Sequence, residues 1–166
     1  MLSWARAMLG SSKRHRKGNA IGDLVDTLIE SAGLYVGLVE DMTHPDDERK
    51  QWNARIEVTP LPGKTAVSLD YECLSQEHGR FHSEHSVLGR TPKGLVMAVA
   101  HPHGTEMLVL REDEPGRFIA GPGDSSFPVA LEIEASEKGR ILHRWLYAPP
   151  GQEIVLHDVA DVRLLT

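Results

Sequence analysis

Residues 129–148 read VALEIEASEKGRILHRWLYA, and this stretch decides the fold class. In VALEIEAS the odd positions are apolar, whereas Glu132, Glu134 and Ser136 are polar. Such alternation is typical of a β-strand with one packed face and one wet face. The triplet EKG is compatible with a tight turn, after which RILHRWLYA alternates again. The stretch therefore predicts an antiparallel β-hairpin.

The same pattern of short alternating runs, separated by Gly, Pro and charged turns, extends from Leu34 to the end of the chain. It predicts an all-β protein with about eight to ten antiparallel strands in up-and-down order. The expected strands are GLYVGLVED (33–41), WNARIEVTP (52–60), TAVSLDYECLS (65–75), RFHSEHSVLG (80–89), LVMAVAHP (95–102), EMLVLRE (106–112), GRFIAG (116–121), VALEIEAS (129–136), RILHRWLYA (140–148) and EIVLHDVADVRLL (153–165).

A series of sequential hairpins leaves two sheet edges that must be hidden, and closing the sheet into a barrel hides both. Before the first strand, apolar residues recur at helical spacing from Ile21 to Ile29, and Gly33 stands where a helix would stop. We therefore expect one short amphipathic helix around Ile21–Ala32 that caps one end of the barrel. Residues 20–166 are expected to form this single domain.

Residues 1–19 have a different composition, with several Lys and Arg and no acidic residue. We interpret them as a flexible basic arm, and an organelle transit peptide is the alternative reading of the same composition. The whole chain carries a formal net charge of −6, which argues against nucleic acid as a partner. With a single cysteine and no apolar run long enough to span a bilayer, we expect a cytoplasmic protein. The sequence leaves a homodimer open.

A barrel of this size is wide enough to hold one small ligand, so an internal pocket is the default functional hypothesis. We expect a mainly apolar interior with a few polar groups, since the candidate lining residues share strand parity with apolar neighbours. These candidates for contact with a small hydrophobic ligand are Tyr71, His85, Met97, His101, His143, Trp145 and Tyr147.

Catalytic residues receive little support from the sequence. Cys73 has the parity of Val67 and Leu69 on its strand, which indicates a packed thiol and not a nucleophile. An alternative is a cupin-like metal-dependent enzyme, because imidazoles on alternate positions of a strand can bind one ion. That site would use the cluster of His82, Glu84, His101 and His103.

Three stretches resemble the nitrobindin-like branch of the calycin superfamily, whose members are similar in fold to fatty-acid-binding proteins. They are GLYVG at 33–37, FHSEHSVLGRTPKGLVMAVAHPHG at 81–104 and LHDVADVRLL at 156–165, in an order that the family preserves. The residues that carry the match are Gly33, Tyr35 and Gly37; His82, Glu84, Leu88 and Arg90; Lys93 and Gly94; Ala100, His101, Pro102 and Gly104; and His157, Ala160 and Val162.

This resemblance implies a ten-stranded calycin-like barrel with haem as its cofactor and His157 as the ligand of the haem iron. Alternation alone places His157 on the face opposite Ala160 and Val162, towards solvent, unless a bulge intervenes. Three function classes thus stay open at this point: a small-ligand-binding barrel, a cupin-like metal-dependent enzyme and a non-catalytic interaction module.

Overall fold

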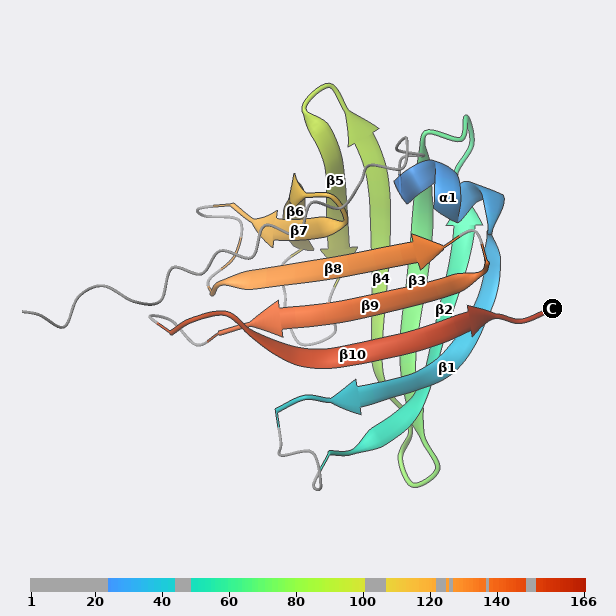
Figure 1. The fold of residues 1–166 in the computed structure, drawn as a ribbon, viewed down its shortest axis with the longest axis vertical. Coiled ribbons are helices and arrows are strands. Elements are labelled where there is room, and N and C mark those ends of the chain that lie inside the picture. Colours follow the sequence, from blue (N-terminus) through green and yellow to red (C-terminus); the bar gives the residue numbers. More distant parts are fainter. Residues whose placement is uncertain are drawn as a thin grey trace, which may run out of the picture.

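The computed structural model describes residues 24–43, 49–100, 107–121, 125, 127–136, 138–148 and 152–166. These residues form one short helix and ten strands (Figure 1). The elements are α1 Leu24–Glu30, β1 Gly33–Asp41, β2 Gln51–Pro60, β3 Ala66–Ser75, β4 Gly79–Thr91, β5 Gly94–Ala100, β6 Met107–Glu114, β7 Arg117–Ala120, β8 Val129–Ser136, β9 Arg140–Tyr147 and β10 Val155–Leu164.

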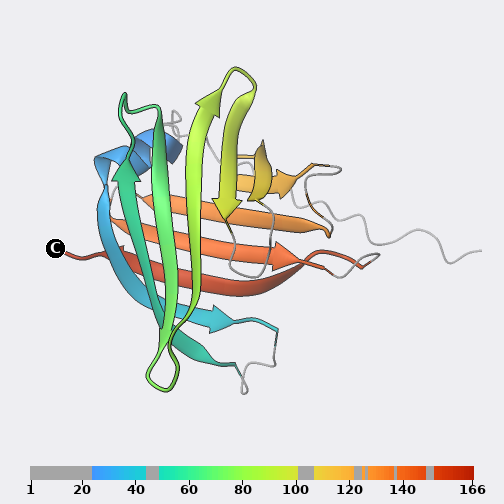
Figure 2. The ribbon, with the colours of Figure 1, turned by 180° about the vertical axis from the view of Figure 1, so that it is seen from behind.

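All ten strands close into one antiparallel barrel in which each strand pairs with its neighbours in the sequence. The last strand, β10, closes the barrel by pairing with β1, from Tyr35 opposite Leu164 to Asp41 opposite Asp158. Figure 2 shows the other wall of the barrel, where the long β3–β4 hairpin lies beside β5. The prediction of an all-β, up-and-down barrel is confirmed.

Gly37 lies at this closing seam between β1 and β10, opposite Val162. A Cβ atom at Gly37 would meet the backbone oxygen of Asp161 at 2.0 Å and the Cα atom of Val162 at 2.8 Å. The two strands therefore approach too closely for any side chain here, and a glycine is required for the seam to form.

Helix α1 covers one end of the barrel through its apolar stripe. Val25 and Leu28 are fully buried, and the helix contacts strands β2, β3, β4 and β8. The expected capping helix is thus confirmed over Leu24–Glu30, while Ile21 lies outside the described residues.

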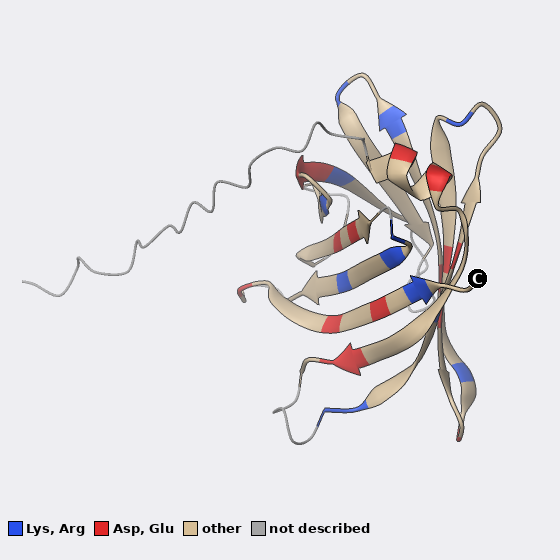
Figure 3. Cartoon of the chain, turned by 45° about the vertical axis from the view of Figure 1, so that its right-hand side comes forward, with Lys and Arg blue, Asp and Glu red and all other residues tan. Residues whose placement is uncertain are grey.

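The outer wall is polar and carries charges of both signs, as Figure 3 shows along strands β8 to β10. Arg140 donates two hydrogen bonds to the Asp161 carboxylate, at 2.8 and 2.6 Å. On the neighbouring pair of strands, Arg144 lies 3.6 Å from Glu132 and 2.7 Å from Glu134. Within the described part of the chain, no helix is long and apolar enough to cross a membrane.

Candidate functional site

Among the described residues, the mainly apolar barrel interior contains a group of polar and aromatic side chains, which we call the inner polar cluster. Strand parity places its members on the inner face: along β4 the residues His82, Glu84 and Ser86 point inwards, and the residues between them point outwards. The cluster consists of Tyr71 on β3, His82 and Glu84 on β4, His143 and Trp145 on β9, and Asp158 on β10.

Glu84 is the centre of the inner polar cluster, and its side chain is 1% exposed. Its carboxylate accepts a hydrogen bond from Trp145 Nε1 at 2.8 Å and lies 3.2 Å from His143 Nε2, so it connects β4 to β9 across the barrel. His82 Nε2 lies 3.7 Å from the same carboxylate. Burial by itself would raise the pKa of Glu84, but hydrogen bonds from His143, His82 and Trp145 lower it to about 2. Glu84 is therefore a buried anion.

Tyr71 forms the aromatic wall beside this anion. Its ring centroid lies 4.7 Å from that of His143 and 5.6 Å from that of His82. Cys73 donates from its thiol to the Tyr71 hydroxyl at 3.0 Å. Burial, followed by the nearby charge of Cys73 and of Asp158, raises the pKa of Tyr71. The phenol is therefore neutral and keeps its own proton to donate.

Besides His82 Nε2, which lies 3.7 Å from Glu84, two polar atoms of the cluster are buried and have no hydrogen-bond partner among the described residues. One is Nδ1 of His143, whose side chain is 2% exposed, and the other is Oδ1 of Asp158. Buried polar atoms in native proteins are nearly always paired, so each such atom indicates a missing partner. The two atoms come from neighbouring strands, with Asp158 opposite Trp145 and His143 opposite Ala160.

His157 and Tyr147 lie next to Asp158, where β9 ends and β10 begins. The register between the two strands shifts between Leu156 and Asp158, so a β-bulge places one additional residue, His157, in β10. The His157 ring packs against that of Tyr147, with centroids 4.3 Å apart, and its Nδ1 lies 3.3 Å from Oδ2 of Asp158. Strand alternation is interrupted at this bulge, so it no longer argues against a His157 that faces the interior. The ring packs on Tyr147, which has inward parity.

Of the residues predicted to line the interior, most of those that the structure describes do lie there. Tyr71, Met97, His143 and Trp145 are on the inner face and nearly or fully buried. Tyr147 has the same parity as Trp145 but is 38% exposed at the end of its strand. His101 lies outside the described residues. Whether these residues contact a ligand stays a prediction.

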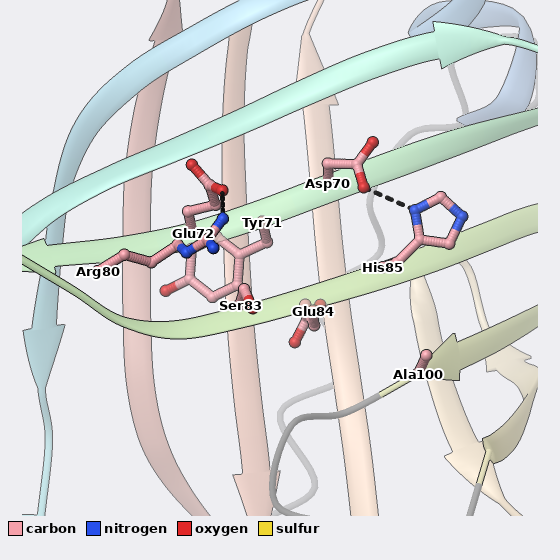
Figure 4. A pocket seen from close by; sticks show the side chains of 8 residues that line it. All are labelled: Asp70, Tyr71, Glu72, Arg80, Ser83, Glu84, His85 and Ala100. Atoms are coloured by element: carbon pink, nitrogen blue, oxygen red, sulfur yellow. Dashed lines mark hydrogen bonds and ion pairs between the residues drawn. The ribbon is translucent and has the colours of Figure 1, made fainter.

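The prediction that His85 lines the interior is wrong. Its side chain is exposed on the outer face, where Nδ1 lies 2.6 Å from Asp70 Oδ1. Figure 4 shows the pair in a pocket that Tyr71 and Glu84 also line, together with the pair that Arg80 makes with Glu72 at 2.8 Å. The strand RFHSEHSVLG has polar residues on both faces, so sequence alternation could not decide between them. The barrel buries the face that carries His82 and Glu84.

The cupin-like metal site receives no support from the described residues. His82 and Glu84 do lie together, but His101 and His103 fall outside the described part of the chain. Among the residues that the structure describes, no group of three His, Cys, Asp or Glu could hold a metal ion.

Comparison with known proteins adds support for the fold. No known family and no curated protein matches the sequence. Among solved structures, the chain is similar to the crystal structure of Rv2717c from M. tuberculosis, with a TM-score of 0.61 and 15% sequence identity. The similarity covers 86% of this chain and 97% of that chain. At this identity the similarity concerns the fold alone, and membership of the calycin superfamily and of its nitrobindin-like branch stays a prediction.

Sequence reasoning missed three members of the inner polar cluster as pocket residues, His82, Glu84 and Asp158. The sequence offered Glu84 as a metal ligand and as part of the family resemblance, and its parity, shared with the buried Leu88, was the signal that it faces the interior. Asp158 shares the parity of Ala160 and Val162. The same alternation that predicted a solvent-facing His157 therefore predicted that Asp158 faces the interior.

Proposed function

We propose that the protein is a small-ligand-binding barrel whose ligand contacts the inner polar cluster. The observation that carries this proposal is the pair of buried, unpartnered atoms, His143 Nδ1 and Asp158 Oδ1, inside the barrel. An unpaired buried polar atom costs about 1–3 kcal/mol, which a bound partner would remove. A barrel that served only as an interaction module would gain nothing from these atoms, because they do not lie on its outer surface.

Saturable binding of a small apolar molecule tests this proposal directly. We expect Nile red, a neutral dye that fluoresces in apolar surroundings, to bind the protein at one site. Its fluorescence should rise to a plateau, and Trp145, at 6% exposure inside the barrel, should be quenched in parallel. A matched variant, Trp145→Phe, should lose this quenching and keep the dye signal. If neither Nile red nor haem binds saturably, the proposal is wrong.

Haem is the candidate ligand that a specific observation favours. A haem-binding histidine needs a neutral ring with its second N–H held by an acceptor, which fixes the tautomer and leaves the other nitrogen for the iron. His157 fits, because Asp158 Oδ2 lies 3.3 Å from Nδ1 and no described residue bonds Nε2. Tyr147 packs against the ring and holds its orientation. When bound, haem would supply an iron centre, and His157 would be its protein ligand.

Haem titration of the parent, of His157→Ala and of His85→Ala tests this assignment. We expect a shifted Soret band that saturates at one equivalent in the parent and in His85→Ala, whose imidazole lies on the outer face. His157→Ala should lose the shift. A parent without a Soret shift, or a His157→Ala variant that binds haem equally well, would remove haem and leave a barrel for another ligand. A cytoplasmic location and a homodimer stay predictions.

A further inference from the structure

We propose that the inner polar cluster selects an organic cation, specifically an amine with an apolar aromatic body, and that Asp158 and His143 bind its N–H groups. This inference rests on the proposed function, since it names the chemical class of the ligand that the barrel would hold. It follows from three independent features of the interior: the sign of its charges, the kind of polar atom that lacks a partner, and its aromatic lining.

The charges inside the barrel are acidic. The Glu84 side chain is 1% exposed, and Asp158 contributes a second carboxylate, whose side chain is 22% exposed. None of the described Lys and Arg residues is buried, so no fixed cation of those types neutralises the two carboxylates from within. Like charges disfavour each other strongly where water is excluded. The interior therefore disfavours a carboxylate or phosphate ligand and favours a cation.

Of the unpartnered atoms, Asp158 Oδ1 is an acceptor, and His143 Nδ1 is one in the neutral imidazole. Because the Glu84 carboxylate is ionised and can only accept, the proton between it and His143 must lie on His143 Nε2, at 3.2 Å. In a neutral imidazole that proton leaves Nδ1 with a lone pair, and Nδ1 is the buried atom without a described partner. Asp158 Oδ1 is likewise an acceptor. A partner that satisfies both atoms in this state donates hydrogen bonds, as an ammonium group does.

The walls around these acceptors are aromatic. Tyr71 packs beside His143, Trp145 lies opposite Asp158, and Tyr147 follows towards the end of the strand. Aromatic faces attract cations through the ring quadrupole and also pack against an apolar body. An inorganic cation fits less well, since the described residues offer no group of three metal-ligating side chains. These features together select an organic amine over a metal ion.

Three probes of one shape and different charge test the inference. They are 2-phenylethylamine, the neutral propylbenzene and the anionic 3-phenylpropionate, each titrated into the full-length protein and followed by calorimetry and by Trp fluorescence. We expect the amine to bind at one site and at least about tenfold more tightly than the other two, because one charged hydrogen bond is of that order. The parent protein alone gives this result, so it does not depend on any variant folding.

Two isosteric variants then locate the charge. Asp158→Asn should weaken binding of the amine at least about tenfold and leave the affinity for propylbenzene unchanged. Asp161→Asn is the matched control, because Asp161 lies on the same strand but points outwards to Arg140. It should leave the affinity for the amine unaltered. Circular dichroism spectra of both variants should match the parent.

The possible failures are distinguishable. If propylbenzene or 3-phenylpropionate binds as tightly as the amine, or if Asp158→Asn binds the amine normally, the cation inference is overturned and the ligand-binding barrel survives. If the amine does not bind while Nile red or haem does, the cation inference is likewise overturned and the ligand-binding barrel survives. Ordered water is then the partner of the two unpartnered atoms. If no probe binds, both proposals fail.

Discussion

Replacing Glu84 with glutamine should destabilise the protein in a strongly pH-dependent way. The pKa of this carboxyl falls from 4.5 to about 2 on folding, because hydrogen bonds from His143, His82 and Trp145 outweigh the opposing effect of burial. At about 1.4 kcal/mol per pH unit, that difference corresponds to about 3 kcal/mol of stability. An uncharged carboxamide cannot provide this contribution, and its N–H₂ group would face a donor.

The direction of the pH dependence of stability follows from proton binding. Between pH 4.5 and about 2 the unfolded chain binds a proton at Glu84 that the folded protein does not bind. The stability from this carboxylate is therefore complete above pH 4.5 and is lost as the pH falls through that window. We expect the free energy of unfolding of the parent to exceed that of Glu84→Gln by about 3 kcal/mol at pH 7 and by about half as much at pH 3.

Urea unfolding followed by Trp fluorescence at pH 7, 5, 4 and 3 measures this difference in the free energy of unfolding. Glu134→Gln is the matched control, since Glu134 lies on the outer face of β8, 2.7 Å from Arg144 and with a 48% exposed side chain. It should cost less than about 1 kcal/mol. A cost below about 1 kcal/mol for Glu84→Gln at pH 7, or a cost that does not change with pH, would refute the reasoning.

Two further predictions concern the closing seam and the buried thiol. Gly37→Ala should lower the free energy of unfolding by about 3 kcal/mol in urea, because its Cβ atom would collide with the β10 backbone; Gly89→Ala, whose Cβ would meet only the Ala66 side chain at 3.3 Å, should cost less. Burial raises the pKa of Cys73 to about 12, so Ellman's reagent at pH 8 should label it only after unfolding. Equal costs for both glycines, or rapid labelling of the native protein, would contradict these statements.

The sequence predicted the barrel because its strands carry their information locally. VALEIEAS and RILHRWLYA alternate with a period of two, and the triplet EKG between them turns the chain, so the hairpin follows from adjacent residues alone. Sequential pairing of all ten strands requires no long-range information beyond the closure of β1 on β10. Alternation put His143 and Trp145 on the same face as Ile141, opposite Arg140 and Arg144, and the structure shows that this face is the inner one.

Alternation failed where both faces of a strand are polar or where the register changes. On β4 the sequence offered His82 and Glu84 on one face and His85 on the other, and only the curvature of the closed sheet decided which face is buried. On β10 the bulge at His157 adds one residue that no local pattern announces. A single inserted residue reverses the face of every side chain on one side of it.

The sequence by itself thus determined the strand content, the order of pairing, the capping helix and most of the apolar interior. Only the tertiary structure decided that Glu84 reaches across the barrel to His143 and Trp145, and that His143 and Asp158 each present an unpaired acceptor inside. Residues 84 and 145 are far apart in the chain, and their strands are not neighbours in the sheet. Their contact depends on the diameter to which the sheet closes, which is a property of all ten strands together and is encoded in no single one of them.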